Sequence, residues 1–515
     1  AGLAFHALLA ESSLDVYTAQ VVLTLDGAVD PARLRAAADA LVERYPNLRA
    51  AFVAAADGAL FAVIPGTVRV PWREIDVTHT ADPETEFARL AAADRAARFD
   101  LSVPPLIRFT LVRTAEQRYR LIVTNHHILL DGWSMPVLLD DLLVHYAGTS
   151  TTPARPYRAF LEWVSHADGD SARTAWRRAF ADSEGPTEIV PTRPGRELSV
   201  LADEYVFDLD AEPLTSRAAS LGITVNTLVQ AAWGLTLAFA TARTDVAFGT
   251  TVSGRPADLA GVERMVGLFI NTVPVRVRFD PVEPATNLLR RLQDEQADLL
   301  PHHHLPLSDI QAVAGPGARF DTLVVFESYP IDTERLASSA HDVAGMSVAG
   351  IDVADATHYP LSLIARVAER AHFRLSYQAN LVGEQELADL ATRFTRVLTD
   401  LTSAPEQQID SLTAAERARA LGELAATAHE IPVCTLVDMF DAQVARTPDA
   451  TALSFLDERL TYAQLASRVN RLARHLATAG VGPEVPVGVA LRRSIDQVVA
   501  TYAVLAAGGV YVPLD

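Results

Sequence analysis

The 515-residue sequence has no lysine, a single cysteine and no long uninterrupted apolar run. Cys434 alone excludes an internal disulfide framework and a multi-cysteine metal site, and it fits a reducing, cytoplasmic location. The start of the chain has no basic segment followed by an apolar one, the pattern of a signal peptide. The apolar stretch 498–512 is interrupted by Gly508 and Gly509, so we interpret it as a buried helix and strand and not as a membrane span.

Charge argues against two classes of partner. The basic residues are 44 arginines, and 64 acidic residues outnumber them to give a formal net charge of −20. A protein of this charge is repelled by a nucleic-acid backbone and by an anionic membrane, so we expect neither as a partner. The length and the 49% hydrophobic content are sufficient for two or three globular domains, each with its own core.

Hydrophobic periodicity predicts an α/β fold. Residues 19–25 have the composition of a strand, Asp26 and Gly27 that of a turn, and a helix follows from Pro31. Residues 225–242 are apolar nearly all round and are expected to form a buried helix. Further helices are predicted at 285–299 and 384–401, and further strands at 119–125, 245–251, 273–278 and 322–327.

The most informative motif is HHILLDG, residues 126–132, at the end of the strand 119–125. Because side chains alternate along a strand, His126 and His127 should point to opposite faces, so that only one of them can face a given cavity. A neutral imidazole can accept a proton from an attacking nucleophile or hold that nucleophile in place. Asp131 could orient the imidazole or pair with an arginine, and Ser134 is a candidate N-cap of the next helix.

The pattern HHxxxDG resembles the signature of condensation domains of nonribosomal peptide synthetases, in the chloramphenicol-acetyltransferase-like superfamily. Other segments resemble that family in the expected order. They are RYPNLRAAF (44–52), YRAFLEW (157–163), VSGRP (252–256), VGLFINTVPVR (266–276), HHHLPLSDI (302–310) and FDTLVVFESYP (320–330). The resemblance implies two lobes, 1–170 and 171–405, which form a V-shaped pseudo-dimer with the histidine motif at their junction.

A second resemblance begins after the linker predicted at 406–432. LTYAQL (460–465) and LAAGGVYVPLD (505–515) look like the first two motifs of an adenylation domain, so 433–515 is interpreted as part of its N-terminal subdomain. The phosphate-binding segment and the residues that select an amino acid are not in the sequence. We therefore expect no amino-acid activation by this fragment.

The resemblance implies peptide-bond formation without a directly bound cofactor or metal. The amine of an acceptor aminoacyl group would attack the thioester of a donor peptidyl group, both carried on phosphopantetheine arms. The partners implied are an upstream donor carrier protein, a downstream acceptor carrier protein and the rest of the adenylation domain. GLAFHALL near the start, HHILLDGWSMPVLL and VFESYP resemble the branch that accepts a D-configured donor residue.

Two residues are candidates for direct participation. His127 is expected to accept a proton from the attacking amine or to orient it. Gly132 would allow close approach of the substrate arm and place an N–H near the developing oxyanion, although a simple turn glycine is nearly as good an interpretation.

The remaining candidates are expected to support the site. His126 and Asp131 are interpreted as structural, and the resemblance gives Asp131 a buried ion pair with Arg255. Trp133, Ser134 and Asn271 are candidates for the substrate tunnel. Metal binding by His302–His304 is not expected, because three consecutive side chains do not easily converge on one ion.

Two other functions remain open from the sequence. An epimerization domain shares HHxxxDG, but such a domain normally closes a module, and here adenylation-like sequence follows. A catalytically silent condensation-like domain could instead recruit another enzyme to a carrier protein, and the intact motif argues against this alternative without excluding it.

Overall fold

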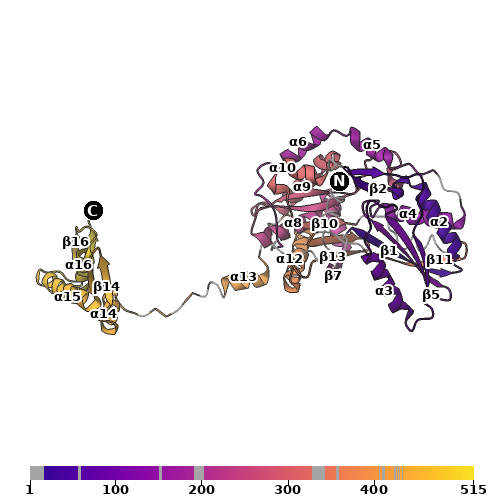
Figure 1. The fold of residues 1–515 in the computed structure, drawn as a ribbon. Helices are drawn as coiled ribbons and strands as arrows, with labels where there is room; N and C mark the ends of the chain where they lie inside the picture. Colours follow the sequence, from indigo (N-terminus) through magenta and orange to yellow (C-terminus); the bar gives the residue numbers. More distant parts are fainter. Residues whose placement is uncertain are drawn as a thin grey trace. The chain divides into compact units, whose positions relative to one another are not determined.

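The computed structural model describes residues 17–514, apart from 56–59, 150–152, 191–201, 328–342, 355–358, 405, 407, 409–411, 423, 424, 426, 429 and 432. The chain forms two compact units, residues 1–413 and 414–515 (Figure 1). The GLAFHALL segment and the last three residues of VFESYP lie outside the described residues.

A five-stranded sheet organises the first half of the first unit, which we call the N-lobe. The strand order is β11-β1-β6-β5-β4. Pairing is antiparallel except between β4 and β5, which are parallel. The strands are β1 (Thr18–Gly27), β4 (Trp72–Asp76), β5 (Ile107–Ala115), β6 (Arg118–His126) and β11 (Met346–Ala354).

Helices cover both faces of this sheet. Val21, Leu23 and Leu25 of β1 point into a core with α2 (Pro31–Arg44) and α4 (Ser134–Ala147). Val22, which alternates with them, points to the opposite face, where α3 (Pro83–Ala96) packs. Burial on both faces fits the uninterrupted apolar runs at the centre of the two strands, residues 21–23 of β1 and 121–123 of β6. The short strands β2 (Ala51–Ala54) and β3 (Leu60–Val63) form a separate hairpin.

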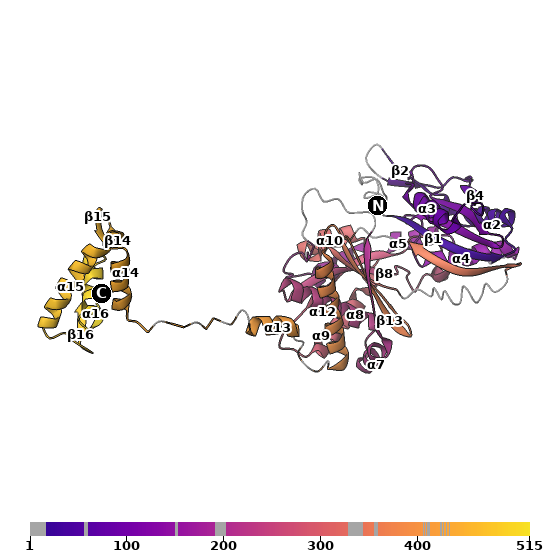
Figure 2. The same cartoon turned by 90° about the horizontal axis from the view of Figure 1, so that it is seen from below.

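The second half of the first unit, the C-lobe, contains a six-stranded sheet in the order β7-β13-β12-β10-β8-β9. Its strands are β7 (Asp203–Asp210), β8 (Asp245–Val252), β9 (Asn271–Arg278), β10 (Thr322–Phe326), β12 (Leu361–Val367) and β13 (Arg370–Tyr377). One face packs against α7 (Ala211–Leu221), α8 (Val225–Thr241), α9 (Ala285–Leu299) and α12 (Glu384–Ser403). Figure 2 shows these helices on the side of the sheet away from the N-lobe.

Three further helices lie near the junction of the lobes. They are α5 (Arg158–His166), α6 (Gly169–Ala179) and α10 (Leu307–Ala314), with 3-10 turns at Pro46–Arg49, Val262–Arg264, Leu300–His302 and Pro316–Ala318. Trp176 of α6 is fully buried in a small core that also contains Ala247 of β8 and Ile310 of α10. α6 therefore belongs by its packing to the C-lobe.

One strand from the sequence range of the C-lobe belongs to the sheet of the N-lobe. β11 lies in the sequence range predicted for the second lobe, yet it pairs antiparallel with β1 of the N-lobe, with Val21 opposite Val353. The boundary at residue 170 does not capture this arrangement, because no local pattern reveals which sheet a strand joins. The pairing links the lobes through backbone hydrogen bonds.

Helix α8 confirms the predicted buried helix: Leu228, Trp233 and Leu235 are each 0% exposed. Among the described residues, no single helix has the length and apolarity needed to cross a membrane. α7 and α8 meet those criteria only as a pair, and they are bent by 103°.

The second unit has its own small core. α14 (Leu436–Arg446), α15 (Tyr462–Thr478) and α16 (Ile495–Ala506) pack around Phe440, Val469 and Val499. Its strands pair as β14 (Thr451–Phe455) with β15 (Glu458–Thr461) and β16 (Pro486–Val489) with β17 (Val510–Pro513), and α13 (Ala414–Leu421) precedes them.

One expectation for this unit was wrong. The helix within 498–512 is partly buried as predicted, but the strand is not, since Val510 is 45% exposed and Tyr511 42%. In the described part of the chain β16 is the only strand that pairs with β17, so apolar composition alone did not indicate burial.

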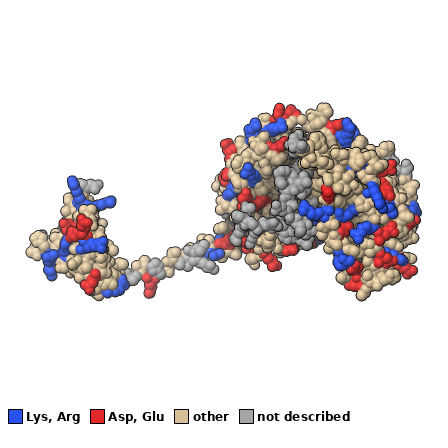
Figure 3. All heavy atoms as spheres, in the orientation of Figure 1, with Lys and Arg blue, Asp and Glu red and all other residues tan. Residues whose placement is uncertain are grey.

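The surface of the first unit carries charges of both signs. On the face shown in Figure 3, arginines and acidic side chains are interspersed. Ion pairs of the first unit include Arg118 with Asp26 at 2.8 Å and Arg291 with Glu283 at 2.7 Å.

Candidate active site at the junction of the lobes

The histidine pair lies where β6 ends. His126 is the last residue of β6 and is 0% exposed, whereas His127 begins the following turn and is partly exposed. The Nδ1 atom of His126 accepts a hydrogen bond from the N–H of Ile128 at 3.1 Å. The backbone N–H of His127 donates to the carbonyl of Tyr17 at 2.8 Å, which ties the turn to the start of β1. His126 thus anchors the strand end, and His127 has the more open position.

Asp131 accepts hydrogen bonds from both lobes with its two carboxylate oxygens. Its Oδ1 accepts from the N–H of Ser134 at 2.9 Å, and its Oδ2 accepts from the N–H groups of Phe269 at 2.9 Å and Ile270 at 3.2 Å. Its own N–H donates to the carbonyl of Gly267 at 3.1 Å. Asp131 is 2% exposed. A buried carboxylate with this many donors fixes the loop that follows the histidines against the loop between β8 and β9 (residues 253–270).

Arg255 completes this network from the C-lobe. Its Nη2 lies 3.3 Å from Asp131 Oδ1, the ion pair that the family resemblance implied. Its Nη1 donates to the carbonyls of Val262 and, at 3.0 Å, Met265, and its guanidinium lies 3.9 Å from the centre of the Phe269 ring. Burial lowers the pKa of Arg255, and the negative charge of Asp131 opposes that change. Removal of either partner would leave a buried charge uncompensated.

Ser134 was predicted to line a substrate tunnel, and the structure contradicts this. Its side chain is 0% exposed, and its hydroxyl lies within hydrogen-bonding distance of Asp131 Oδ1, the Gly267 carbonyl and Arg255 Nη2 at 2.8–2.9 Å. It is also the first residue of α4 and not its N-cap, which is Trp133. The chain makes its turn before α4 begins. The side-chain hydroxyl of Ser134 therefore points into the interface between the lobes.

Trp133 and Gly132 remain partly exposed beside this interface. The indole Nε1 of Trp133 donates to the carbonyl of Glu263 at 3.4 Å, so the side chain reaches the β8–β9 loop of the C-lobe. Gly132 lies in the turn between Asp131 and α4. Together with His127 they form the accessible part of the motif.

An aromatic cluster within the YRAFLEW segment, residues 157–163, supports the β8–β9 loop from the other side. The phenol of Tyr157 donates to the carbonyl of Leu268 at 2.5 Å, and its ring packs edge-on against Phe269. Burial raises the pKa of Tyr157. A Cβ at Gly267 would lie 2.1 Å from this ring, so only glycine allows the approach. The YRAFLEW and VGLF segments are thus joined in space.

Asn271 holds the triple-histidine segment in place. Its side-chain amide donates to the carbonyls of His303 at 2.8 Å and Leu305 at 2.7 Å, and its Oδ1 accepts from the N–H of Thr272. Both amide hydrogens therefore bond to the backbone of the C-lobe. Within the described part of the chain, no three side chains of the metal-binding types converge as a metal site requires.

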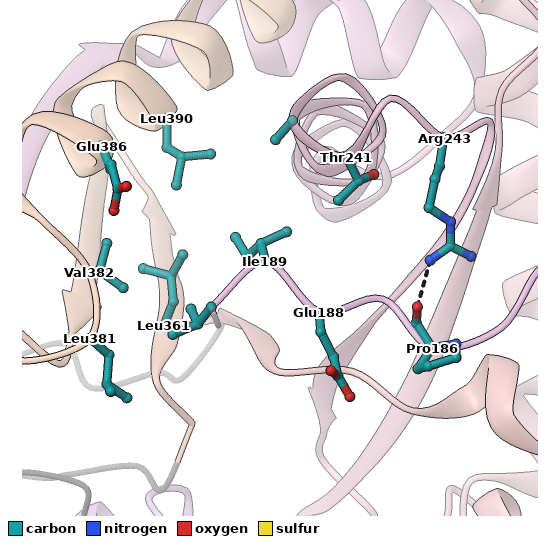
Figure 4. A pocket seen from close by; sticks show the side chains of 12 residues that line it. Pro186, Glu188, Ile189, Thr241, Arg243, Leu361, Leu381, Val382, Glu386 and Leu390 are labelled. Atoms are coloured by element: carbon teal, nitrogen blue, oxygen red, sulfur yellow. Dashed lines mark hydrogen bonds between the residues drawn. The ribbon is translucent and has the colours of Figure 1, made fainter. Parts of the chain in front are cut away.

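A cavity of about 740 Å³ lies elsewhere, at the helix-covered end of the C-lobe (Figure 4). Apolar side chains from β12, α8 and α12 line it, and Glu188, Arg243 and Glu386 lie among them. Arg243 is bound to the carbonyl of Pro186 at 2.6 Å. None of the candidate residues of the histidine motif lines this cavity, so it is separate from the site at the junction.

Comparison with known proteins supplies the family. Residues 1–421 match the family described as "Condensation domain", and residues 440–515 match "AMP-binding enzyme". The whole chain is 34% identical to part of a linear gramicidin synthase and 30% identical to part of tyrocidine synthase 2, both from Brevibacillus parabrevis. It is 29% identical to part of surfactin synthase subunit 3 from Bacillus subtilis. The chain spans only 7%, 15% and 41% of these relatives, respectively.

Solved structures show the same fold. The first condensation domain of the calcium-dependent antibiotic synthetase covers 77% of this chain, which covers 94% of that domain, with a TM-score of 0.60 and 22% identity. A four-domain nonribosomal peptide synthetase bound to AMP and glycine covers all of this chain, which covers 41% of it, with a TM-score of 0.67 and 19% identity. The chain therefore belongs to the condensation-domain family, and a partial AMP-binding segment follows that domain.

Proposed function

We propose that residues 1–413 form a peptide bond between two residues tethered to carrier proteins, the acceptor amine attacking the donor thioester. The observation that carries this proposal is the position of His127. It is partly exposed at the end of β6, while Asp131 and Arg255 join the loop behind it to the other lobe. A thioester is already activated, so holding two reactants in the correct geometry supplies much of the required rate enhancement.

His127 is the proposed group that orients the acceptor amine or accepts its proton. A neutral imidazole performs either task near physiological pH. Gly132, in the adjacent turn, is proposed to let the substrate arm approach the backbone and to offer an N–H to the developing oxyanion. The substrates would arrive on phosphopantetheine arms, which supply the thioester chemistry from the carrier proteins.

Asp131, Arg255 and His126 are proposed to position the site without contacting the reacting atoms. Each of them makes hydrogen bonds within the protein, and His126 and Asp131 are almost completely buried. Trp133 and Asn271 remain proposed wall residues of the substrate tunnel. Asn271 would act by fixing the backbone at His303 and Leu305.

The partners proposed are an upstream donor carrier protein, a downstream acceptor carrier protein and the remainder of an adenylation domain. We retain the proposed division into an N-lobe (1–170), a C-lobe (171–405), a linker (406–432) and an adenylation segment (433–515). Strand β11 comes from the second range and joins the sheet of the first. The adenylation segment is proposed to be inactive by itself, because the phosphate-binding motif is not in this sequence. A D-configured donor residue and a cytoplasmic location are further parts of the proposal.

The test is a transfer assay with two loaded carrier proteins. One carries a donor dipeptide that ends in a D or an L residue, the other carries an acceptor amino acid, and intact-protein mass spectrometry follows the mass of each carrier. We expect the acceptor carrier to gain the donor mass, and the D-terminal donor to react faster. No transfer with either donor, despite measurable carrier binding, would contradict the proposal and favour a silent recruitment domain.

A second arm separates condensation from epimerization. The donor carrier is incubated alone with the protein, and the configuration of its terminal residue is measured after hydrolysis. We expect the configuration to be retained. Inversion without an acceptor would contradict condensation.

A further inference from the structure

Asn125, the second-last residue of β6, carries a buried side-chain amide and is 0% exposed. In the described part of the chain, neither its Oδ1 nor its Nδ2 has a hydrogen-bond partner. The preceding side chain is satisfied: the hydroxyl of Thr124, also 0% exposed, donates to Asp94 at 2.5 Å and accepts from Gln20 at 3.1 Å. Burial removes the hydrogen bonds that an amide makes to bulk water, so an amide without replacement partners lowers stability.

The two faces of β6 are covered by different helices, and this determines where Asn125 points. Val123 belongs to the core with α2 and α4, whereas Ile122 packs in the cluster on the face of α3. Side chains alternate along a strand, so Asn125 points, like Val123, to the face of α2 and α4. The residues directly across from it are Ala19 of β1 and Ile107 of β5. Both side chains are apolar, and that of Ala19 is a single methyl group.

The strand pairing of β6 continues beyond its last residue, His126, and includes His127. The N–H of His127 donates to the carbonyl of Tyr17 at 2.8 Å, which is the next pair in the register of β1 with β6. On the side of β5, the N–H of His126 donates to the carbonyl of Leu106 at 2.9 Å. A continued register continues the alternation of side chains, so His127 points to the same face as Asn125. At about 3.4 Å per residue, the Cα atoms of these two residues lie about 7 Å apart.

A water molecule is the partner that fits the amide at this position. With hydrogen bonds of about 2.8–3.0 Å on each side, one water joins two polar groups that are roughly 5–6 Å apart. The amide oxygen and nitrogen of Asn125 and the imidazole of His127 offer it three partners, the number that a buried water usually has. A larger polar ligand would need access from solvent, and Asn125 has no exposed surface.

We propose that Asn125 is a positioning residue whose side-chain amide binds a buried water, and that this water also bonds to the imidazole of His127. The effect on catalysis rests on the proposed condensation reaction, whereas the water site does not. A hydrogen bond to a fixed water restricts the rotation of the imidazole, which must face one direction to orient or deprotonate the acceptor amine. The amide both donates and accepts, so it supports the water whichever nitrogen of the ring carries the proton.

The test compares two variants of nearly the same shape that differ in polarity. Asn125→Thr introduces a hydroxyl that both donates and accepts, and Asn125→Val has a methyl group in place of that hydroxyl. Intact-protein mass spectrometry measures transfer between the loaded carrier proteins over a range of donor-carrier concentrations. We expect Asn125→Val to lower the rate at saturating donor about tenfold with an unchanged half-saturating concentration, and Asn125→Thr to stay within about threefold of the unaltered protein.

A matched control and a second background distinguish positioning of His127 from a general disturbance of the sheet. Thr110 of β5 is 3% exposed, lies across from Ile122, and has a hydroxyl without a partner among the described residues. Thr110→Val thus exchanges a hydroxyl for a methyl group on the opposite face, and it should leave the transfer rate unchanged. In a His127→Ala background, Asn125→Val and Asn125→Thr should differ by less than about twofold, because the ring that the water positions is gone.

A high-resolution crystal structure of the unaltered chain tests the water site without any measurement of activity. We expect electron density for one water at about 2.7–3.2 Å from the amide of Asn125 and from a ring nitrogen of His127. The same density should be missing in Asn125→Val. An amide that bonds only to protein groups in the crystal would overturn the water site.

The results distinguish the positioning role from the condensation reaction. A rate of Asn125→Val equal to that of the unaltered protein, or a tenfold loss that persists in the His127→Ala background, would overturn the positioning role. If Asn125→Val does not fold, the crystal structure of the unaltered chain decides the question by itself. Absence of transfer by the unaltered protein would instead contradict the condensation reaction, and the crystal structure would still test the water site.

Discussion

The chain contains two runs of histidines, and they differ in almost every property except composition. His126 ends a strand and His127 begins the turn after it, beside a carboxylate that both lobes bind. His302–His304 lie in a 3-10 turn and the residues after it, among aromatic side chains: the ring of His303 stacks near Trp176, and that of His304 meets Trp163 edge-on. The first run is at the junction of the lobes, and the second packs within the C-lobe and on α5.

The difference shows that histidine chemistry depends on what surrounds the ring. Burial, reinforced by the charges of His302 and His304, lowers the pKa of His303 to about 4. That imidazole stays neutral at physiological pH, and its backbone carbonyl is bound by Asn271. His127 instead begins a partly exposed turn whose backbone is fixed on both sides. The two runs therefore differ in exposure and in what holds the adjacent backbone, and only the first combines a partly exposed histidine with a turn fixed by the other lobe.

The largest expected effect is on the rate of peptide transfer, which should depend on the first run of histidines and not on the second. We expect His127→Ala to reduce peptide transfer about 10²–10⁴-fold, because it removes the group proposed to orient or deprotonate the amine. His304→Ala, the matched control in the second run, should change transfer by less than about threefold. Single-turnover mass spectrometry measures both, with the melting temperature as a check on folding. Equal losses in the two variants would break the comparison.

The second effect tests whether Asp131 supports the first run structurally. Asp131→Ala leaves Arg255 as an uncompensated buried charge and should lower the free energy of unfolding by about 3–5 kcal/mol. Replacing both partners, as in Asp131→Ala/Arg255→Met, should recover part of that loss. Urea denaturation measures the stability of the unaltered protein and both variants. A stable Asp131→Ala protein that has lost transfer would argue for a direct role of the carboxylate.

The third effect tests whether the side chain of Asn271 stabilises the backbone at His302–His304. Asn271→Ala removes the donor to the carbonyls of His303 and Leu305 and should cost about 1–3 kcal/mol of unfolding free energy. Asn271→Asp is a useful companion, because it keeps the shape and loses the two N–H donors. Chemical denaturation, with hydrogen exchange of residues 300–306, would show the change. Unaltered exchange in that segment would contradict the assignment.

The smallest effect is the pH dependence of stability. The unfolded chain binds a proton at His303 below pH 6.5, whereas the folded protein does so only near pH 4, so the free energy of unfolding should decrease as the pH falls through that window. Asp321 has the opposite sign, because burial raises its pKa to about 6, and its contribution decreases as the pH rises. The comparison is therefore made against His303→Gln, which lacks only the His303 contribution, so the melting temperature of the variant relative to that of the unaltered protein should increase as the pH falls from 6.5 to 4. Parallel curves for the two proteins would rule out the His303 contribution.

Much of the local structure was predictable from the sequence. The strand at 19–25, the helix from Pro31 and the apolar helix 225–242 all lie where periodicity placed them, as β1, α2 and α8. Strand burial was less predictable: Val510 and Tyr511 of the apolar strand β17 are exposed in this chain, where β16 is the one described strand that pairs with it. The prediction that Ser134 lines a substrate tunnel was wrong for a related reason. The direction of its side chain depends on contacts with segments that are distant in the sequence.

The sequence by itself determined many of the helices and strands and singled out the HHILLDG motif, because periodicity and residue type are local properties. It also anticipated the ion pair of Asp131 with Arg255 through the family resemblance. Only the tertiary structure decided which segments meet: β11 joins the other lobe's sheet, Phe269 and Ile270 bind Asp131, and Gly267 makes room for Tyr157. These contacts join residues far apart in the sequence, and their geometry depends on packing within and across the two lobes, which no local pattern contains.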